Sequence, residues 1–144
     1  MSAFMKSLQG MNSLYCCLQA KREFSMIKTN IVETGAIVEF LVEGNSNVQE
    51  VLDIISSQYR SYSTGILWNF VGGSNSSLST DEMIRIANTV KKHAIHKRTA
   101  YIGSVDLEYG ILRMYESYAE TSAVPAEMKV FRNRDEALQW IKKA

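Results

Sequence analysis

Residues 98–120 read RTAYIGSVDLEYGILRMYESYAE, and this stretch decides the fold class. Its first part is an apolar run that is typical of a buried strand. From Asp106, a candidate helix cap, the spacing of apolar residues changes to that of an amphipathic helix. The residues that recur at this spacing are Leu107, Ile111, Met114, Tyr115 and Tyr118. A buried strand followed directly by a helix predicts the repeating unit of an α/β protein.

Gly110 is an unexpected residue in this helix, because a helical glycine costs about 1 kcal/mol relative to alanine. Arg113 follows it on the same side of the predicted helix. In one interpretation, Gly110 permits tight packing of the helix on a strand, while Arg113 pairs with Glu116 or with a neighbouring carboxylate. In the other, Gly110 and Arg113 help to bind a carboxylate or phosphate, for which arginine offers a fixed fork of donors.

The strand pattern extends along most of the chain. Residues 24–32 and 36–42 are β-rich runs joined by a short connection that contains Gly35, which predicts a hairpin. Further strands, most of them strongly apolar, are predicted at residues 65–71, 99–105 and 127–131.

Helices are predicted between the later strands and after the last one. Their candidate caps are Asn47, Ser79, Asp106 and Asp135. Ser79 and Glu82 also have the spacing of a capping box. The resulting order, β-β-α-β-α-β-α-β-α, predicts one α/β domain with a mostly parallel sheet and an N-terminal hairpin.

The composition fits a single globular domain and limits its partners. The chain has 144 residues, of which 46% are hydrophobic, so it can bury a core without a disulfide or a metal. A net charge of +1 gives no field that favours nucleic acid. No run approaches the roughly 18 apolar residues that a membrane span needs. Cys16 and Cys17 are adjacent, which predicts reduced thiols in a cytoplasmic protein.

Residues 1–22 differ from the rest and are expected to form a peripheral N-terminal extension. Their composition fits neither a signal peptide nor a lipidated cysteine. Three interpretations are open: an amphipathic helix, a disordered arm, or sequence upstream of a later start such as Met26. The domain itself is expected to span residues 23–144.

The sequence contains none of the common catalytic signatures, such as a P-loop, a nucleophile elbow or a zinc-protease motif. His93 and His96 lie three residues apart on a predicted helix and are the one candidate metal pair. Neighbouring lysines, including Lys91 and Lys92, would repel a cation, so we expect a solvated helix end whose charge complements the helix dipole. A non-enzymatic protein without a metal or cofactor is predicted.

The loop after the strand at 65–71 leads into a helix N-terminus, where open α/β sheets tend to hold ligands. Gly72 and Gly73 allow a close approach of the backbone. The hydroxyls that this loop offers, each also a candidate for phosphorylation, belong to Ser74, Ser76, Ser77 and Ser79. The simpler interpretation is a plain connection whose last serine caps the helix.

Residues 103–110 form a second connection from a buried strand into a helix. Because the carboxyl ends of parallel strands meet at one edge, Gly103 and Ser104 are expected near the first loop. The helix adds Asp106, Gly110 and Arg113 to this candidate site for an anionic group.

Three aromatic residues are candidates for lining an apolar pocket between the loops at 72–79 and 103–110: Trp68, Tyr101 and Tyr109. The alternative is that these residues are ordinary members of the core.

The C-terminal half carries a combined pattern of an aspartate, then aromatic-Gly-x-x-Arg-Met-x-Glu, then Val-Phe-x-x-x-x-Glu-Ala-x-x-Trp. In this chain the pattern consists of Asp106, Tyr109, Gly110, Arg113, Met114, Glu116, Val130, Phe131, Glu136, Ala137 and Trp140. On these residues, and on GILWNFVGG at 65–73, the chain resembles the SpoIIAA-like family of small bacterial proteins over roughly residues 24–143. The resemblance implies a STAS-like fold, a layer of four or five strands with helices packed against it.

STAS domains of the anti-sigma-factor-antagonist type bind a partner kinase and carry a phosphorylatable serine in an Asp-Ser dipeptide at a helix start. This chain resembles them but has Asn69 where that aspartate falls, and the following loop has no Asp-Ser. The loop serines are therefore loose candidates for the phosphorylated residue. Related folds also include lipid-binding modules.

The expected function is a non-enzymatic regulatory or protein-binding module of STAS type in the cytoplasm. The alternative is a small-ligand or lipid-like binding protein with a pocket between the loops at 72–79 and 103–110. The expected partners are a protein, a small apolar or anionic ligand, or a second copy of the chain in a homodimer.

Overall fold

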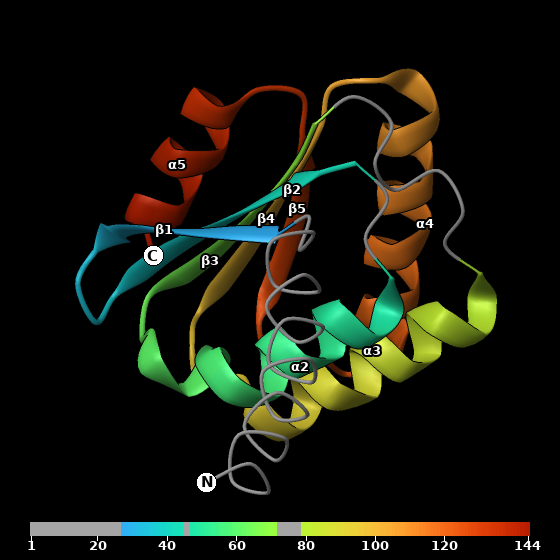
Figure 1. The fold of residues 1–144 in the computed structure, drawn as a ribbon, viewed down its shortest axis with the longest axis horizontal. Coiled ribbons are helices and arrows are strands. Elements are labelled where there is room, and N and C mark those ends of the chain that lie inside the picture. The colour runs from blue at the N-terminus through green and yellow to red at the C-terminus, as the bar shows by residue number, and fades with distance from the viewer. Residues whose placement is uncertain (1–26, 45–46, 72–78) are drawn as a thin grey trace, which may run out of the picture.

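The protein is described by a computed structural model that covers residues 27–44, 47–71 and 79–144. The predicted extension at 1–22 and the glycines and serines of the loop at 72–78 lie outside the described residues. The elements, which Figure 1 labels, are β1 (Ile27–Glu33), β2 (Ile37–Glu43), α2 (Val48–Gln58), a short 3-10 turn η1 (Tyr59–Ser61), β3 (Gly65–Val71), α3 (Thr80–His93), β4 (Arg98–Gly103), α4 (Asp106–Thr121), β5 (Glu127–Phe131) and α5 (Arg134–Lys142).

The strands form one five-stranded sheet in the order β1-β2-β3-β4-β5. β1 pairs with β2 in antiparallel fashion, and Gly35, with a φ of 73°, allows the tight connection between them. The other strands are parallel, with Phe40, Trp68 and Tyr101 side by side across the sheet. The α/β class and the mostly parallel sheet are therefore as the sequence predicts.

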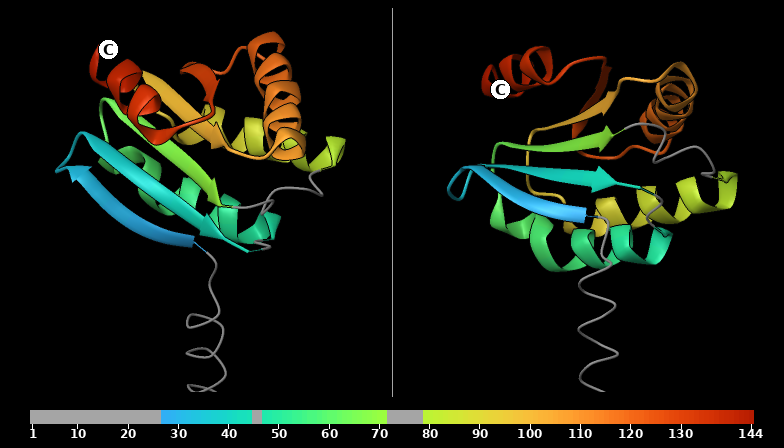
Figure 2. Two further views of the ribbon diagram at one scale, coloured as in Figure 1. Left: turned by 90° about the horizontal axis from the view of Figure 1, so that it is seen from above. Right: turned by 45° about the horizontal axis from the view of Figure 1, so that its top comes forward.

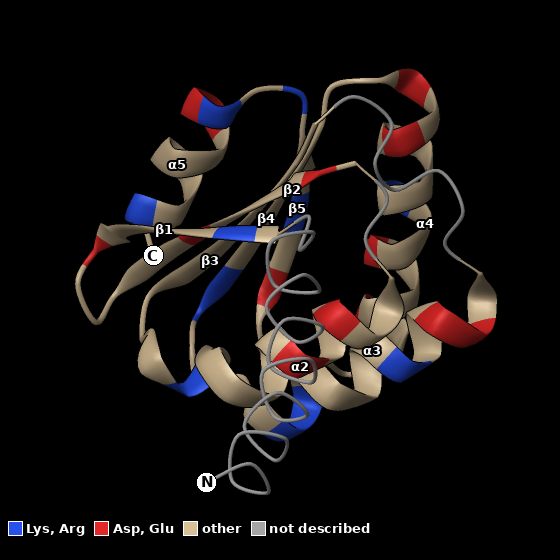
Figure 3. Ribbon diagram, viewed as in Figure 1, with Lys and Arg blue, Asp and Glu red and all other residues tan. Residues whose placement is uncertain are grey.

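Helices cover both faces of the sheet, as the two views in Figure 2 show. α2, α3 and α4 bury one face with the larger cluster of apolar residues, which includes Phe40, Ile55 and Leu112. α5 covers the opposite face with a smaller cluster, which includes Ala137 and Ile141. In the view of Figure 3, basic and acidic residues are interspersed along the helices, in keeping with the small net charge.

Two of the predicted helix caps are confirmed. The side chain of Asn47 accepts a hydrogen bond from the backbone N–H of Glu50 at 2.9 Å. Ser79 and Glu82 form the complete capping box, because each side chain accepts a hydrogen bond from the other's backbone N–H.

The other two predicted caps are wrong by one or two residues. α4 begins at Asp106 itself, and the residue at its cap position, Val105, makes no capping hydrogen bond with its side chain. The carboxylate of Asp106 instead accepts a hydrogen bond from Arg132 at 2.6 Å. α5 is capped by Asn133, whose side chain accepts a hydrogen bond from the backbone N–H of Glu136. Asp135 lies in the first turn instead, where its negative charge interacts favourably with the helix dipole.

Candidate functional site

The carboxyl ends of β3 and β4 lie side by side, because the two strands are parallel neighbours and Phe70 is paired with Gly103. The connections that follow these strands therefore leave the same edge of the sheet, as the sequence predicts. Ser104 is exposed at this edge. The remaining candidates from the first connection, namely Gly72, Gly73, Ser74, Ser76 and Ser77, lie outside the described residues.

Gly103 is the glycine that permits tight packing at this edge. A Cβ atom added to it would lie 3.0 Å from both the backbone nitrogen and the Cα of Tyr109, and 3.1 Å from Leu112 Cδ1. These distances are too short for an ordinary side-chain contact. The first turn of α4 therefore rests directly on the end of β4.

Gly110 has the opposite environment. A Cβ atom added to it would meet nothing within 4 Å among the atoms outside its own helix. The interpretation that Gly110 permits tight packing of α4 on a strand is therefore wrong. The described residues offer no explanation for the glycine penalty in this helix.

Arg113 pairs with Glu116 on its own helix, with 3.2 Å between Nη1 and Oε1. This pairing is one of the two interpretations of Arg113 made from the sequence. Asp106 likewise has a cationic partner in Arg132, whose guanidinium lies over the ring of Tyr109 at 4.2 Å from the ring centroid. The sequence reasoning missed Arg132, although it directly follows β5, the parallel neighbour of β4.

The apolar face of α4 differs from the predicted one. Leu107 and Met114 were expected on the packed face, but each is 61% exposed. Tyr115 is buried as expected, whereas Ile111 and Tyr118 are half-buried. The residues that α4 buries are Glu108, Leu112, Tyr115 and Ala119. The close contact between Gly103 and Tyr109 sets this rotation of the helix, which an apolar spacing alone does not specify.

A small cavity of about 50 Å³ lies between the sheet and the helices on its larger apolar face. Trp68 and Tyr101 contribute to its wall, as predicted, but Tyr109 does not. No residue of 103–110 lines it either, so the cavity is not the predicted pocket beside that loop. Its lining consists of Asn47, Val48, Val51, Ile55, Tyr59, Trp68, Phe70, Ile86, Tyr101, Leu112 and Tyr115.

The polar groups of this cavity are neutral. Trp68 donates a hydrogen bond from Nε1 to the hydroxyl of Tyr59 at 2.8 Å. Burial raises the pKa of Tyr59, Tyr101 and Tyr115 well above the usual value of a phenol, so their hydroxyls stay protonated at neutral pH. Because the described lining also contains no Lys or Arg, this cavity suits a neutral molecule and not the anionic ligand considered above.

The sequence placed His93 and His96 on one helix, and this prediction is wrong. α3 ends at His93, and His96 lies in the connection to β4. The ring of His96 is buried, meets the ring of Tyr59 edge to face and hydrogen-bonds through Nε2 to Thr99. Burial lowers the pKa of His96 to about 4, so it is neutral at physiological pH. Among the described residues, no group of His, Cys, Asp and Glu side chains could hold a metal ion.

A buried carboxylate on the opposite face was not found from the sequence. Glu39 on β2 accepts hydrogen bonds from Asn30 at 3.0 Å, Asn69 at 3.1 Å and Arg134 at 2.9 Å. Burial raises the pKa of Glu39, but these hydrogen bonds and the charge of Arg134 outweigh it and bring the pKa below its usual value. Because the partners of Glu39 are other residues of this chain, the cluster ties α5 to the hairpin and to β3.

Within the described ranges, no helix is long and apolar enough to cross a membrane. Comparisons of the chain with protein-family models, with curated proteins and with solved structures found no match.

Proposed function

We propose that this protein is a non-enzymatic regulatory module of STAS type, which acts in the cytoplasm by binding another protein. The proposal rests on the sequence resemblance described above and on one feature of the fold. That feature is a group of exposed apolar side chains where β3 and β4 end and α4 begins.

Three large apolar residues are exposed at this edge of the sheet. Val71 is 48% exposed, Val105 is 43% exposed, and Leu107 at the start of α4 is more exposed still. Val71 directly follows the pair of Phe70 with Gly103, and Val105 lies just beyond Gly103. Single exposed apolar residues are common, but several at one edge are typical of a protein interaction surface.

The loop serines offer a way to regulate such a contact. Ser74, Ser76 and Ser77 follow Val71 in the chain, so a phosphate on any of them would add negative charge close in sequence to an apolar surface residue. Desolvating that charge would weaken an apolar contact. In this proposal the unphosphorylated form binds its partner and the phosphorylated form does not.

Site-specific photo-crosslinking in the native cell tests this proposal. A photoreactive amino acid at Val105 is expected to trap one recurrent protein of different mass from this chain. The matched control is Ile95, an apolar residue with 57% exposure that precedes β4 and so lies at its other end. Equal crosslinking at both positions, or none at Val105, contradicts a partner surface at this edge.

Intact-mass measurement of protein from the same cells tests the regulatory part. A mass increase of one phosphate, lost on phosphatase treatment and mapped to the loop serines, is expected in the fraction that is not crosslinked. An unmodified chain under all growth conditions contradicts the phosphorylation switch but not the contact at Val105.

The cavity supports a second candidate function, the binding of a small neutral apolar molecule. Trp68, Tyr101 and Tyr115 surround it with apolar and aromatic surface and with uncharged hydroxyls, which is the chemistry of a small-molecule site. Native mass spectrometry of protein purified from its own cells is expected to show a bound small molecule. Val51→Phe, which fills the cavity, should abolish this mass, and Ile95→Phe should not. A wild-type protein without any bound molecule contradicts this candidate.

A further inference from the structure

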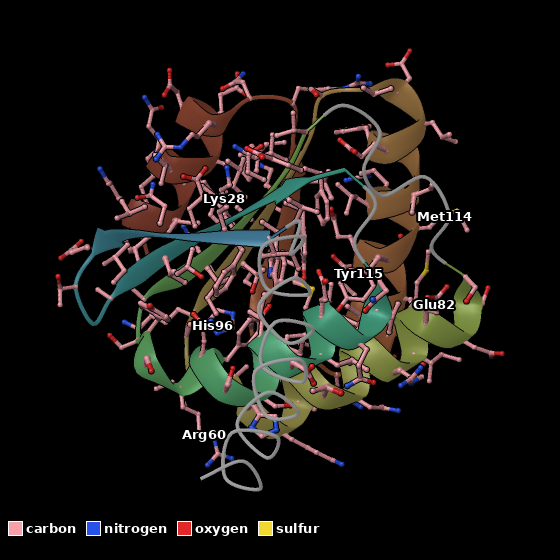
Figure 4. All side chains as sticks on the ribbon, in the orientation of Figure 1. Lys28, Arg60, Glu82, His96, Met114 and Tyr115 are labelled. Carbon is pink, nitrogen blue, oxygen red and sulfur yellow. The ribbon has the colours of Figure 1, made fainter. Side chains whose placement is uncertain are left out.

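The solvent-facing side of α4 carries a short apolar strip with a gap in its middle. Leu107, Gly110 and Met114 have the spacing of one helix face, and all three are exposed. Figure 4 shows Met114 on the side of α4 that faces away from the core, whereas the neighbouring Tyr115 lies on the side toward α2. Gly110 leaves bare backbone between the two large side chains.

Among the described residues, no group fills the gap at Gly110. Alanine would fit at this position, because an added Cβ meets nothing within 4 Å, and it would also favour the helix. The close approach of another backbone is the physical requirement that glycine meets best. The described parts of the chain supply no such neighbour, and a second molecule can supply one.

The strip is self-complementary when two α4 helices lie antiparallel. With a two-fold axis beside Gly110 and Ile111, Leu107 of one protomer meets Met114 of its partner, and the reverse contact follows by symmetry. Gly110 and Ile111 lie on opposite sides of the strip, and the axis keeps each side in common. Gly110 of one protomer therefore faces Gly110 of the other, and the two backbones can approach closely. Parallel helices would instead place Leu107 opposite Leu107 and Met114 opposite Met114.

The charges beside the strip favour the same arrangement. Asp106 and Arg113 flank one side of it, with side chains that are 94% and 56% exposed. A two-fold axis perpendicular to the helices places the charged sides of both helices on the same side of the pair. Arg113 of each protomer therefore lies next to Asp106 of the other. Each Asp106 can then accept from Arg132 of its own chain and from the partner's arginine.

We propose that α4 pairs antiparallel with α4 of a second copy of this chain, through Leu107, Gly110 and Met114, with Arg113 and Asp106 joined across the contact. This inference deepens the proposed protein-binding role, on which it rests, by naming one partner as the chain itself. A single helix pair buries little surface, so the dimer is expected to be weak and in exchange with monomers.

Sedimentation of the full chain over a range of concentrations tests the pairing. A reducing agent is kept present, so that Cys16 and Cys17 cannot crosslink the copies. Wild-type protein is expected to show a monomer–dimer equilibrium. Gly110→Ala is expected to weaken it by about tenfold in Kd, although the monomer becomes more stable to heat. An unchanged Kd in this variant, or a wild type that is monomeric at the highest soluble concentration, overturns the proposal.

A charge exchange tests the antiparallel register independently. Arg113→Asp and Asp106→Arg should each abolish the homodimer, because each creates two like-charge pairs across the axis. When the two variants are mixed, a heterodimer should form, since both pairs are then opposite in charge. Lys91→Asp, an exposed charge reversal on α3, is the control and should leave Kd unchanged. A mixture that stays monomeric contradicts this register.

The two experiments separate this inference from the proposed function. A monomeric chain that still crosslinks another protein through Val105 refutes the pairing and leaves the protein-binding role in place. A dimer with the expected variant pattern, but without a crosslinked partner of different mass, supports the pairing and refutes the role in binding another protein.

Discussion

Gly103 and Gly110 lie within one strand–helix unit, and they have opposite surroundings. A Cβ on Gly103 would press on the backbone of Tyr109, whereas a Cβ on Gly110 would meet no described group within 4 Å. The first glycine is needed for the fold, and the second reduces helix stability without making a compensating contact among the described residues. Glycine at position 103 is therefore explained by packing within the chain, whereas glycine at position 110 is a candidate for contact with another molecule.

The two faces of α4 extend this comparison. The inner face carries Leu112 and Tyr115, both almost fully buried, and Tyr115 meets Tyr101 edge to face. The outer face carries Leu107 and Met114, which are equally apolar but exposed. Apolar residues on the inner face hold the helix in place, so those on the outer face are available for contact with another molecule.

Truncating one leucine on each face is the sharpest test of this difference. Leu112→Ala is expected to lower the free energy of unfolding by about 3 kcal/mol, because it removes buried contacts and enlarges the cavity. Leu107→Ala is expected to change it by less than about 0.5 kcal/mol, as is usual for surface positions. Urea unfolding at low protein concentration measures both. Similar losses in the two variants would mean that α4 buries both faces.

A methyl group on Gly103 should also be costly. Gly103→Ala is expected to lower the free energy of unfolding by about 2 kcal/mol, because the first turn of α4 must move away from β4. Chemical denaturation measures the loss, and wild-type stability in this variant would show that α4 can shift freely.

The same change at Gly110 should have the opposite sign. Gly110→Ala is expected to raise the free energy of unfolding by about 1 kcal/mol at concentrations where the protein is monomeric, because alanine is the better helix former and meets no neighbour. Thermal unfolding by circular dichroism measures the gain. A loss of stability would reveal an internal contact at this position.

A small effect is expected for the ion pair between Arg113 and Glu116. Glu116→Gln removes the partner of Arg113 and should lower the free energy of unfolding by about 0.5 kcal/mol at low salt, because the arginine is largely solvated. The difference from wild type should vanish at high salt, which screens the pair. A larger loss that persists at high salt would show that Glu116 has another role, since its side chain is mostly buried.

The parts of the fold that depend on neighbours in the sequence were predictable. The turn at Gly35 and the caps at Asn47 and Ser79 rest on contacts within a few residues. Strand β3 was predictable from its continuous apolar run. Asp106 failed as a cap because its carboxylate binds Arg132, which is 26 positions away in the chain. Local rules do not include such a competing partner.

The site was less predictable than the fold. The strand and helix pattern of the sequence correctly predicted that the ends of β3 and β4 lie together and that Trp68 and Tyr101 line a cavity. The pattern wrongly placed Tyr109 at the pocket, whereas its ring lies under Arg132. It also gave no sign of the buried cluster around Glu39. The bond from Arg134 to Glu39 joins residues 95 positions apart, and no sequence pattern connects them.

The sequence by itself determined the α/β class, the hairpin and two of the four helix caps, because these follow from apolar periodicity and short-range hydrogen bonds. Only the tertiary structure decided which side of α4 is buried. An apolar spacing defines a helix face only to within about one residue, or about 100° of rotation. The contact of Gly103 with Tyr109 selects one rotation, and it leaves Leu107, Gly110 and Met114 facing solvent.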